Sequence, residues 1–268
     1  MIKLIATDVD GTLVEDGTCR INPEYFTVIQ QLRELGIQVA AASGRQADSL
    51  LSLFEPVRDK MFFISNNGGV IGTSSRILFV ANMDETLLQR LLEDCKAFPD
   101  CYLLLSAAEE SYYLEDCPED FVHLITEEYR FGAEPVKDWK SLPPIVKVAI
   151  YHDPALPHPA RVLIEQWRGR LTGVVSGREW VDFIGPGVSK GRALRELMES
   201  LEVSAEEIMV FGDQMNDLPM MEQAKHSFTV GGAREEVKAA AAHVTAPMQE
   251  DGVLQVLKNL VKNKGEFT

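Results

Sequence analysis

The chain has little of several features that define specialised protein classes. Its 268 residues include four cysteines, 13 prolines and 19 glycines. These proline and glycine counts exclude a collagen-like chain and argue against disorder. No apolar run approaches the ~18 residues that a membrane-spanning helix requires. Asp8 and Asp10 follow the N-terminus too soon for the apolar stretch of a signal peptide. We therefore expect a globular protein without a membrane span.

The cysteines and histidines show no pattern typical of a metal site. The cysteines lack C-x-x-C spacing, and the five histidines are scattered along the chain. Free thiols in a reducing compartment are favoured over a disulfide framework or a zinc site, so we expect a cytoplasmic protein. The four cysteines are Cys19, Cys95, Cys101 and Cys117.

Basic residues are also scarce. The chain has 26 lysines and arginines against 41 acids, which gives a net charge of −15. Nucleic acids and anionic membranes are bound through basic patches, so neither is an expected partner. A pocket can differ in sign from the whole chain, and a small anionic substrate is not excluded. The hydrophobic content of 46% is sufficient for one large domain or two small ones.

Two styles of secondary structure alternate along the chain. At both ends, apolar strands without polar interruptions alternate with helices, which is typical of a parallel sheet covered on both faces. In the middle third, the strands are short and half-buried and the helices are amphipathic, which favours layers of antiparallel character. The end strands are expected at 2–7, 37–42, 61–64, 208–211 and 226–230, and the middle ones at 101–106, 112–114, 146–151, 172–176 and 181–184.

We predict an α/β fold from this pattern. A Rossmann-like, doubly wound parallel sheet would be formed by residues 1–83 and 186–268, and a smaller α+β domain would be inserted at 84–185. Ser189 is expected to cap a helix. Ser204 and Glu207 have the spacing of a helix capping box.

Four polar segments follow directly after predicted strands, where ligands collect in open α/β sheets. Each segment has a simpler explanation when it is taken alone. An Asp-x-Asp pair before glycine can form a turn, and Ser43 before Gly44 can cap a helix. Lys190 stands at a predicted helix start, where a positive charge opposes the helix dipole and an anion would offset it. The segments are 8–12, 43–44, 189–191 and 212–217.

The order and spacing of these segments resemble the four motifs of the haloacid dehalogenase superfamily of phosphohydrolases. The D-V-D-G-T motif at 8–12 has nearly the full family form. The long insertion and the run G-D-Q-M-N-D-L-P-M at 212–220 resemble the Cof-like subgroup, subfamily IIB. The resemblance covers 1–83 and 186–268. It implies a phosphatase of small phosphorylated metabolites, such as sugar phosphates, in which the insert is a cap that closes over the active site and sets specificity.

The resemblance also implies the chemistry. Asp8 would attack phosphorus to form an aspartyl-phosphate, and Asp10 would protonate the leaving oxygen and then deprotonate water. Two carboxylates and a phosphate dianion need a cation, so Mg²⁺ is the expected cofactor. Its ligands would be the carboxylates of Asp8 and Asp213 and the main-chain carbonyl of Asp10.

Other motif residues would hold the phosphoryl group or support the residues that do. Thr12 and Asp217 are the supporting residues, and Asp217 would orient Lys190 or a metal-bound water. The phosphoryl oxygens would be held by the main-chain N–H groups of Val9 and Gly44 and by the side chains of Ser43, Lys190 and Asn216.

Three further residues are candidates for contact with the substrate. Arg45 matches a frequent arginine of the family, Asn67 lies in an N-N-G-G turn like that of the family, and Arg178 lies near the end of the insert. A plain turn for Asn67 and a surface or packing role for Arg178 are the simpler alternatives. Gly232 stands where the family usually has asparagine, so a polar contact of that loop is lost.

Two other functions stay open. A related sugar phosphomutase would need cap arginines for a second phosphate, but the insert has only 10 bases against 19 acids, and these bases are scattered. A non-catalytic phosphate-binding regulator would usually lack one of Asp8, Asp10, Lys190 or Asp213, and all four are present. The acidic insert itself favours a solvated surface. The expected partner is a small metabolite, and the expected state is a monomer or homodimer.

Overall fold

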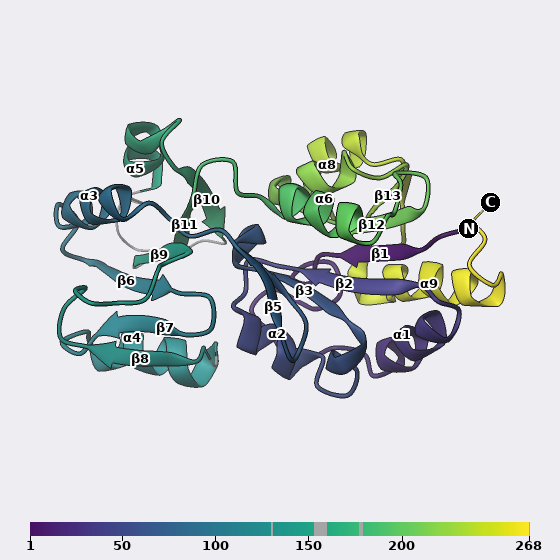
Figure 1. Cartoon of the computed structure of the whole chain (residues 1–268), viewed down its shortest axis with the longest axis horizontal. Coiled ribbons are helices and arrows are strands. Elements are labelled where there is room, and N and C mark those ends of the chain that lie inside the picture. Colours follow the sequence, from purple (N-terminus) through teal and green to yellow (C-terminus); the bar gives the residue numbers. More distant parts are fainter. Residues whose placement is uncertain (130, 153–159, 177–178, 268) are drawn as a thin grey trace. The chain divides into compact units, whose positions relative to one another are not determined.

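The computed structural model describes residues 1–129, 131–152, 160–176 and 179–267. The chain divides into two compact units, which Figure 1 shows coloured along the sequence. The core unit comprises Met1–Arg45, Leu50–Phe79 and Ser189–Thr268. The insert unit comprises Gln46–Ser49 and Val80–Val188.

A mainly parallel sheet forms the centre of the core unit. Its strands are β1 (Leu4–Thr7), β2 (Gln38–Ala42), β3 (Phe62–Ser65), β4 (Val70–Gly72), β5 (Ile77–Val80), β12 (Ile208–Gly212), β13 (His226–Thr229) and β14 (His243–Val244). They lie in the order β14-β13-β12-β1-β2-β3-β4-β5. The strands from β14 to β3 are parallel, and β4 is antiparallel to β3. All of β1 and β12 is buried, as expected for strands covered on both faces.

Helices cover this sheet on both faces (Figure 1). They are α1 (Glu24–Glu34), α2 (Ala47–Leu53), α6 (Lys190–Ser200), α7 (Leu218–Met221), α8 (Glu235–Ala240) and α9 (Gly252–Lys262). Helix α1 packs beside α9, and α6 packs beside α7 on the other face. In α1, Tyr25, Val28, Ile29 and Leu32 are buried at helical spacing. The predicted Rossmann-like core is confirmed.

The strand register brings the predicted motif segments to one edge of the sheet. The last residue of β1 pairs with Ala41 of β2 and with Phe211 of β12. Asp8 therefore emerges beside the ends of both neighbouring strands, where Ser43 and Asp213 follow. Carboxyl ends of parallel strands meet at the same edge, so residues about 200 positions apart become neighbours.

Two details of the core differ from the sequence-based expectations. The third strand lies at Phe62–Ser65 rather than 61–64, and the strands β4 and β5 after it were not predicted. The capping-box pattern starts no helix. The N–H and hydroxyl of Ser204 do bond the Glu207 carboxylate, at 3.1 and 3.0 Å, but β12 begins directly afterwards. Lys3 bonds the Glu207 main chain at the start of β1, which draws this segment into the sheet.

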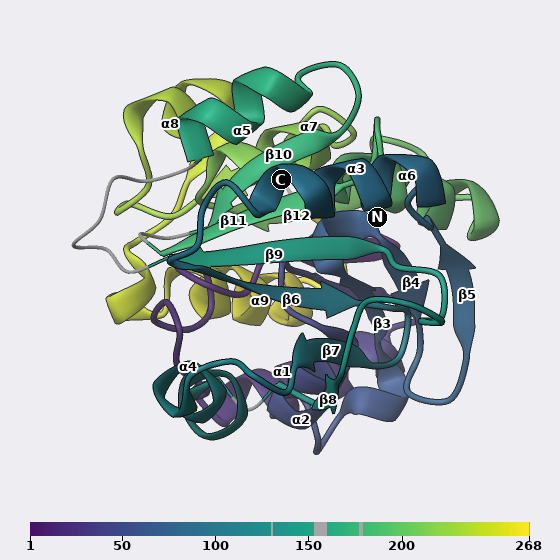
Figure 2. The ribbon, with the colours of Figure 1, turned by 90° about the vertical axis from the view of Figure 1, so that its left-hand side faces the viewer.

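The insert unit has its own sheet (Figure 2). Its strands are β6 (Cys101–Ser106), β7 (Ser111–Leu114), β8 (Ala133–Val136), β9 (Lys147–His152), β10 (Thr172–Ser176) and β11 (Trp180–Ile184). They lie in the order β10-β11-β9-β6-β7-β8. All these pairings are antiparallel except that of β7 with β8. The predicted α+β character is confirmed, whereas β8 was missed.

Helices pack on both faces of the insert sheet. They are α3 (Glu85–Cys95), α4 (Glu119–His123), which continues as a π-helical segment over Leu124–Glu128, and α5 (Ala160–Trp167). Helices α3 and α5 share one apolar cluster with Val148 and Phe183 of the sheet. Phe121 and Ile125, from α4 and the π-helical segment, share the other cluster with Trp180. Among its described residues, the insert unit therefore has two apolar clusters of its own.

Within the described ranges, none of the helices combines the length and apolar character needed to cross a membrane. The four cysteines all lie in described segments and are free thiols.

The Gly232 position allows a stability prediction. A Cβ there would meet no atom within 4 Å, and its φ lies outside the left-handed region. We expect Gly232→Ala to raise the free energy of unfolding by about 0.4–1 kcal/mol, because alanine restricts the unfolded chain. Gly68→Ala is the contrasting variant, since Gly68 has φ +98° and its Cβ would lie 2.3 Å from the Ser189 carbonyl oxygen. Urea unfolding of both variants checks this, and a loss of stability in Gly232→Ala would contradict it.

Candidate active site

Asp8 is the buried centre of the site. It follows β1 directly, its main-chain N–H bonds the Phe211 carbonyl oxygen at 2.9 Å, and the residue is 3% exposed. Its Oδ1 accepts a hydrogen bond from Lys190 Nζ at 2.5 Å, and its Oδ2 lies 3.1 Å from the Thr12 hydroxyl. One oxygen is therefore oriented by Thr12 of the same loop, and the other by Lys190 from a distant part of the chain.

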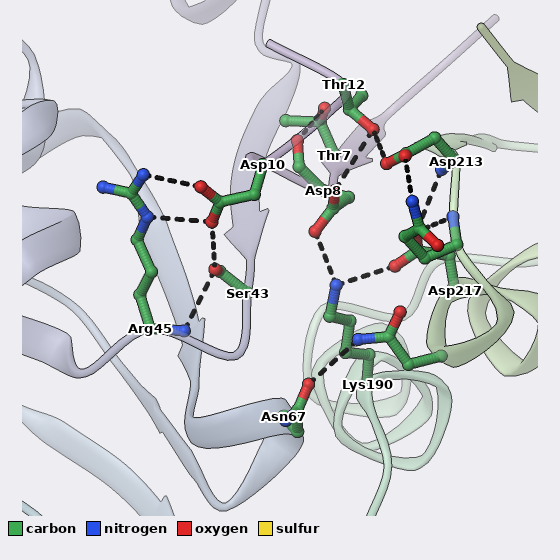
Figure 3. Close-up of polar contacts among 12 residues, drawn as sticks. Thr7, Asp8, Asp10, Thr12, Ser43, Arg45, Asn67, Lys190, Asp213 and Asp217 are labelled. Carbon is green, nitrogen blue, oxygen red and sulfur yellow. Dashed lines mark hydrogen bonds and ion pairs between the residues drawn. The ribbon is translucent and has the colours of Figure 1, made fainter. Parts of the chain in front are cut away.

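Lys190 reaches Asp8 from the first turn of α6. Ser189 caps this helix by accepting the Arg192 N–H at 3.1 Å. Lys190 is 2% exposed, and its Nζ lies between Asp8 and Asp217, 2.7 Å from Asp217 Oδ1 (Figure 3). The ammonium thus links β1 with the loop after β12.

Asp213 and Asp217 come from that loop. Asp217 Oδ2 accepts the main-chain N–H groups of Asp213 and Gln214, both at 3.0 Å. Asp213 Oδ2 accepts the Gln214 side-chain amide at 2.8 Å, and Asp213 Oδ1 lies 2.9 Å from the Thr12 hydroxyl. Gln214 was missed by the sequence analysis, although it stands between two residues that were named.

A glycine allows the two acidic loops to approach each other. Gly11 has φ +78°, and a Cβ there would lie 2.5 Å from Asp213 Oδ2. Any side chain at this position would therefore collide with the carboxylate. The resulting proximity lets the Thr12 hydroxyl reach both Asp8 and Asp213.

Three carboxylates with one neighbouring ammonium determine the electrostatics. Single oxygens of Asp8, Asp213 and Asp217 lie within 4.8 Å of one another. Burial, and then Asp217, raise the pKa of Asp8 well above its usual value, while Lys190 opposes this shift. Burial and Asp217 also raise the pKa of Asp213. Burial lowers the pKa of Lys190, but Asp217 and Asp8 outweigh it and raise that pKa above its usual value.

Asp10 belongs to a second group on the other side of the β1 loop (Figure 3). Arg45 contacts its carboxylate twice, through Nη2 at 2.6 Å and Nε at 2.8 Å. Arg45 Nη2 also bonds the Thr18 carbonyl oxygen at 2.6 Å. Ser43 Oγ lies 3.5 Å from Asp10 and accepts the Arg45 main-chain N–H at 3.1 Å. Arg45 was predicted to contact the substrate, and in this structure its guanidinium lies on Asp10.

Asn67 and Asn216 form a third group. Asn216 Nδ2 donates to Asn67 Oδ1 at 3.1 Å. The Asn67 amide also packs against Gly44, where a Cβ would lie 3.2 Å from Asn67 Nδ2. The Asn216 amide is therefore held by Asn67, which is also a predicted site residue.

A comparison with protein families identifies the chain's relatives. Residues 5–257 match the model of the haloacid dehalogenase-like hydrolases. The chain belongs to this family. The superfamily predicted from the sequence is therefore confirmed, and this member is a phosphatase enzyme of the haloacid dehalogenase type.

Individual relatives cover nearly the whole chain. The 5-amino-6-(5-phospho-D-ribitylamino)uracil phosphatase YbjI of Escherichia coli is 28% identical, over 99% of this chain and 98% of its own. A phosphoglycolate phosphatase of Methanoculleus marisnigri is 30% identical, over 96% of each chain. A crystal structure from Eubacterium rectale superposes with a TM-score of 0.86 at 36% identity, covering 97% of this chain and 99% of that one.

The fold of this haloacid dehalogenase-like hydrolase brings five of the predicted site residues into one group. Asp8, Thr12, Lys190, Asp213 and Asp217 meet in one hydrogen-bonded cluster. The Asp10 carboxylate lies with Ser43 and Arg45, outside that cluster. The Val9 side chain is part of the apolar core, so only its main chain is available to a ligand. Arg178 lies outside the described residues.

Proposed function

We propose that the protein is a Mg²⁺-dependent phosphomonoester hydrolase that acts on small phosphorylated metabolites through an aspartyl-phosphate on Asp8. The observation that carries the proposal is the Asp8 carboxylate, buried at the sheet edge with one oxygen 2.5 Å from the Lys190 ammonium. The names of the Escherichia coli and Methanoculleus marisnigri relatives, which specify phosphorylated small molecules, support the substrate class. We further propose that the insert at 84–185 sets the choice among such substrates.

Asp8 and Asp10 divide the reaction between them. An Asp8 oxygen attacks phosphorus, the bond from phosphorus to the ester oxygen breaks, and Asp10 gives the leaving oxygen a proton. Asp10 then takes a proton from water, whose oxygen attacks the same phosphorus and releases phosphate and free Asp8. Arg45 orients the Asp10 carboxylate for both transfers through its two contacts.

Cationic and amide groups hold the charge of the transferring phosphoryl group. Lys190, already hydrogen-bonded to Asp8, is placed to neutralise phosphoryl oxygens as the bond forms. Asp217 accepts a hydrogen bond from Lys190 and so fixes the position of the ammonium. Ser43, Asn216 and the main-chain N–H groups of Val9 and Gly44 complete the proposed phosphoryl contacts.

The donor set fits a divalent cation. Asp8, Asp213 and Asp217 are 3%, 5% and 0% exposed, and a single ammonium cannot balance three carboxylates in that environment. Asp217 already uses both oxygens on Lys190 and on main-chain N–H groups. The carboxylates of Asp8 and Asp213 and the Asp10 carbonyl are therefore the proposed ligands. When bound there, Mg²⁺ would polarise the phosphoryl group and offset its charge.

The raised pKa of Asp213 predicts how a substitution at this residue changes the stability of the metal-free protein. The pKa of Asp213 is raised in the folded state, so the folded protein holds the Asp213 proton more tightly than the unfolded chain does. Protonated Asp213 therefore favours the folded state fully below pH ~4. This favourable contribution is lost as the pH rises through the pKa of the folded state. We expect Asp213→Asn to stabilise the metal-free protein at neutral pH by roughly 1 kcal/mol, because it removes one buried like charge. The same variant should lose the Mg²⁺-dependent rise in melting temperature.

Urea unfolding in EDTA across pH, and thermal unfolding with and without Mg²⁺, check this prediction. Asp100→Asn is the control, since Asp100 is exposed and lies in the insert unit. Equal stability of Asp213→Asn and wild type in EDTA at neutral pH would contradict the prediction. So would a persistent Mg²⁺ response in the variant.

Phosphate release from p-nitrophenyl phosphate and from a panel of phosphorylated metabolites tests the proposed function. We expect release that requires Mg²⁺ and stops with EDTA. A phosphomutase would instead convert one hexose monophosphate into its isomer, after priming with the bisphosphate and without net phosphate release. Absence of release across the panel in the presence of Mg²⁺ would overturn the proposal.

A further inference from the structure

The turn between β3 and β4 has an uncommon backbone. Asn66, Asn67 and Gly68 have φ values of 51°, 57° and 98°, so three consecutive residues lie in the left-handed region. Both asparagines are buried, at 1% and 2% exposure. Left-handed residues other than glycine persist where surrounding contacts hold them, and they concentrate at functional sites.

Main-chain contacts tie this turn to the phosphate-binding loops. The Asn66 N–H bonds the Arg45 carbonyl oxygen at 2.8 Å, and the Asn67 N–H bonds the Ser43 carbonyl oxygen at 3.0 Å. Gly68 lies so close to the start of α6 that a Cβ would be 2.3 Å from the Ser189 carbonyl oxygen. One turn therefore sets the positions of the loop after β2 and of the helix that carries Lys190.

The two asparagine side chains differ in what they contact. Asn67 Oδ1 accepts the Asn216 amide at 3.1 Å, and Figure 3 draws this contact as the dashed line from the labelled Asn67. Asn66 Oδ1 has no hydrogen-bond partner among the described residues. The preference of asparagine for left-handed turns explains both residues. It does not explain why, among the described residues, the Asn67 side-chain oxygen bonds another residue of the site whereas the Asn66 side-chain oxygen bonds none.

We propose that Asn67 is a positioning residue that orients the Asn216 amide toward the phosphoryl group. An amide nitrogen carries two hydrogens, and accepting one of them at Asn67 Oδ1 directs the other away from Asn67. Without Asn67, the Asn216 amide rotates freely and loses affinity for phosphate. The inference rests on the proposed function, in which Asn216 holds phosphoryl oxygens.

Glycine substitutions separate the side chain from the turn. Asn67→Gly keeps the left-handed backbone and removes the amide, and Asn66→Gly makes the same change at the neighbouring position as a matched control. Inorganic phosphate affinity of the full chain in Mg²⁺ is measured by titration calorimetry, and kcat and KM are measured with p-nitrophenyl phosphate. We expect Asn67→Gly to weaken phosphate binding by roughly three- to tenfold, the value of one hydrogen bond. Asn66→Gly should stay within about twofold of wild type.

The double variant Asn67→Gly/Asn216→Ala decides whether Asn67 acts through Asn216. We expect it to bind phosphate no more weakly than Asn216→Ala alone. The inference would be overturned if the losses of phosphate affinity in Asn67→Gly and Asn216→Ala multiplied in the double variant. It would also be overturned if the two glycine variants lost equal affinity, or if Asn216→Ala bound phosphate as tightly as wild type. The proposed function fails if the wild type releases no phosphate from any ester. This result is separate from the inference on Asn67, because calorimetry measures binding rather than turnover.

Discussion

Asp8→Asn abolishes phosphate release, lowering kcat by at least about 10⁴-fold with p-nitrophenyl phosphate. The amide has the shape of the carboxylate but is not nucleophilic, and it cannot form the acyl phosphate. Its oxygen can still accept the Lys190 hydrogen bond that Asp8 Oδ1 accepts in this structure. Initial rates in Mg²⁺, with the melting temperature measured alongside, check the prediction.

Asp10→Asn is the matched control for this result. It removes an acid–base group from the same loop, and general acid catalysis typically contributes about 10²–10⁴-fold. A p-nitrophenolate leaving group needs little protonation, whereas an alkoxide needs it fully. We therefore expect Asp10→Asn to lower kcat/KM for alkyl phosphates much more than for p-nitrophenyl phosphate, because kcat/KM reports the step in which the leaving group departs. Hydrolysis of the aspartyl-phosphate, which also uses Asp10, is common to both substrates. Full activity of a folded Asp8→Asn variant would exclude Asp8 as the nucleophile.

Lys190→Met destabilises the metal-free protein by about 3–5 kcal/mol, the cost of leaving a buried charge without its partner. Lys190 is 2% exposed and lies within 2.7 Å of both Asp8 and Asp217, so its loss leaves three buried carboxylates facing one another. Methionine has nearly the same length, which limits the cavity left behind. Urea unfolding in EDTA measures the effect.

The double variant Lys190→Met/Asp217→Asn separates charge from packing. If the buried charges cause the loss, removing one anion together with the cation recovers part of the stability. If the loss comes from packing, the double variant is at least as unstable as Lys190→Met alone. Wild-type stability of Lys190→Met would contradict the electrostatic account altogether.

The core was predictable because its signals are local. Buried parallel strands are continuous apolar runs, and the four motif segments follow strands whose ends meet at one sheet edge. Asp8 and Asp213 could therefore be placed together although they are far apart in sequence. In the insert, β8 (Ala133–Val136) has two exposed residues and a proline, so no apolar run marks it.

Contacts between loops were less predictable. Pairing of Arg45 with Asp10, and of Asn67 with Asn216, depends on side-chain directions that residue spacing does not encode. Ser204 and Glu207 form the local hydrogen bonds of the capping-box pattern, but the residues that follow them pair in the sheet as β12 instead of forming a helix. A local sequence pattern indicates which groups can form hydrogen bonds. Tertiary packing determines whether those residues lie in a helix, a strand or a loop.

The stereochemical course at phosphorus tests most directly whether the reaction passes through Asp8. A phosphorothioate ester made chiral with oxygen isotopes is hydrolysed in isotopically labelled water, and the configuration of the released thiophosphate is determined. Attack by Asp8 followed by attack of water inverts phosphorus twice, so we predict net retention. Net inversion would mean that water attacks the ester directly, and it would contradict the aspartyl-phosphate account.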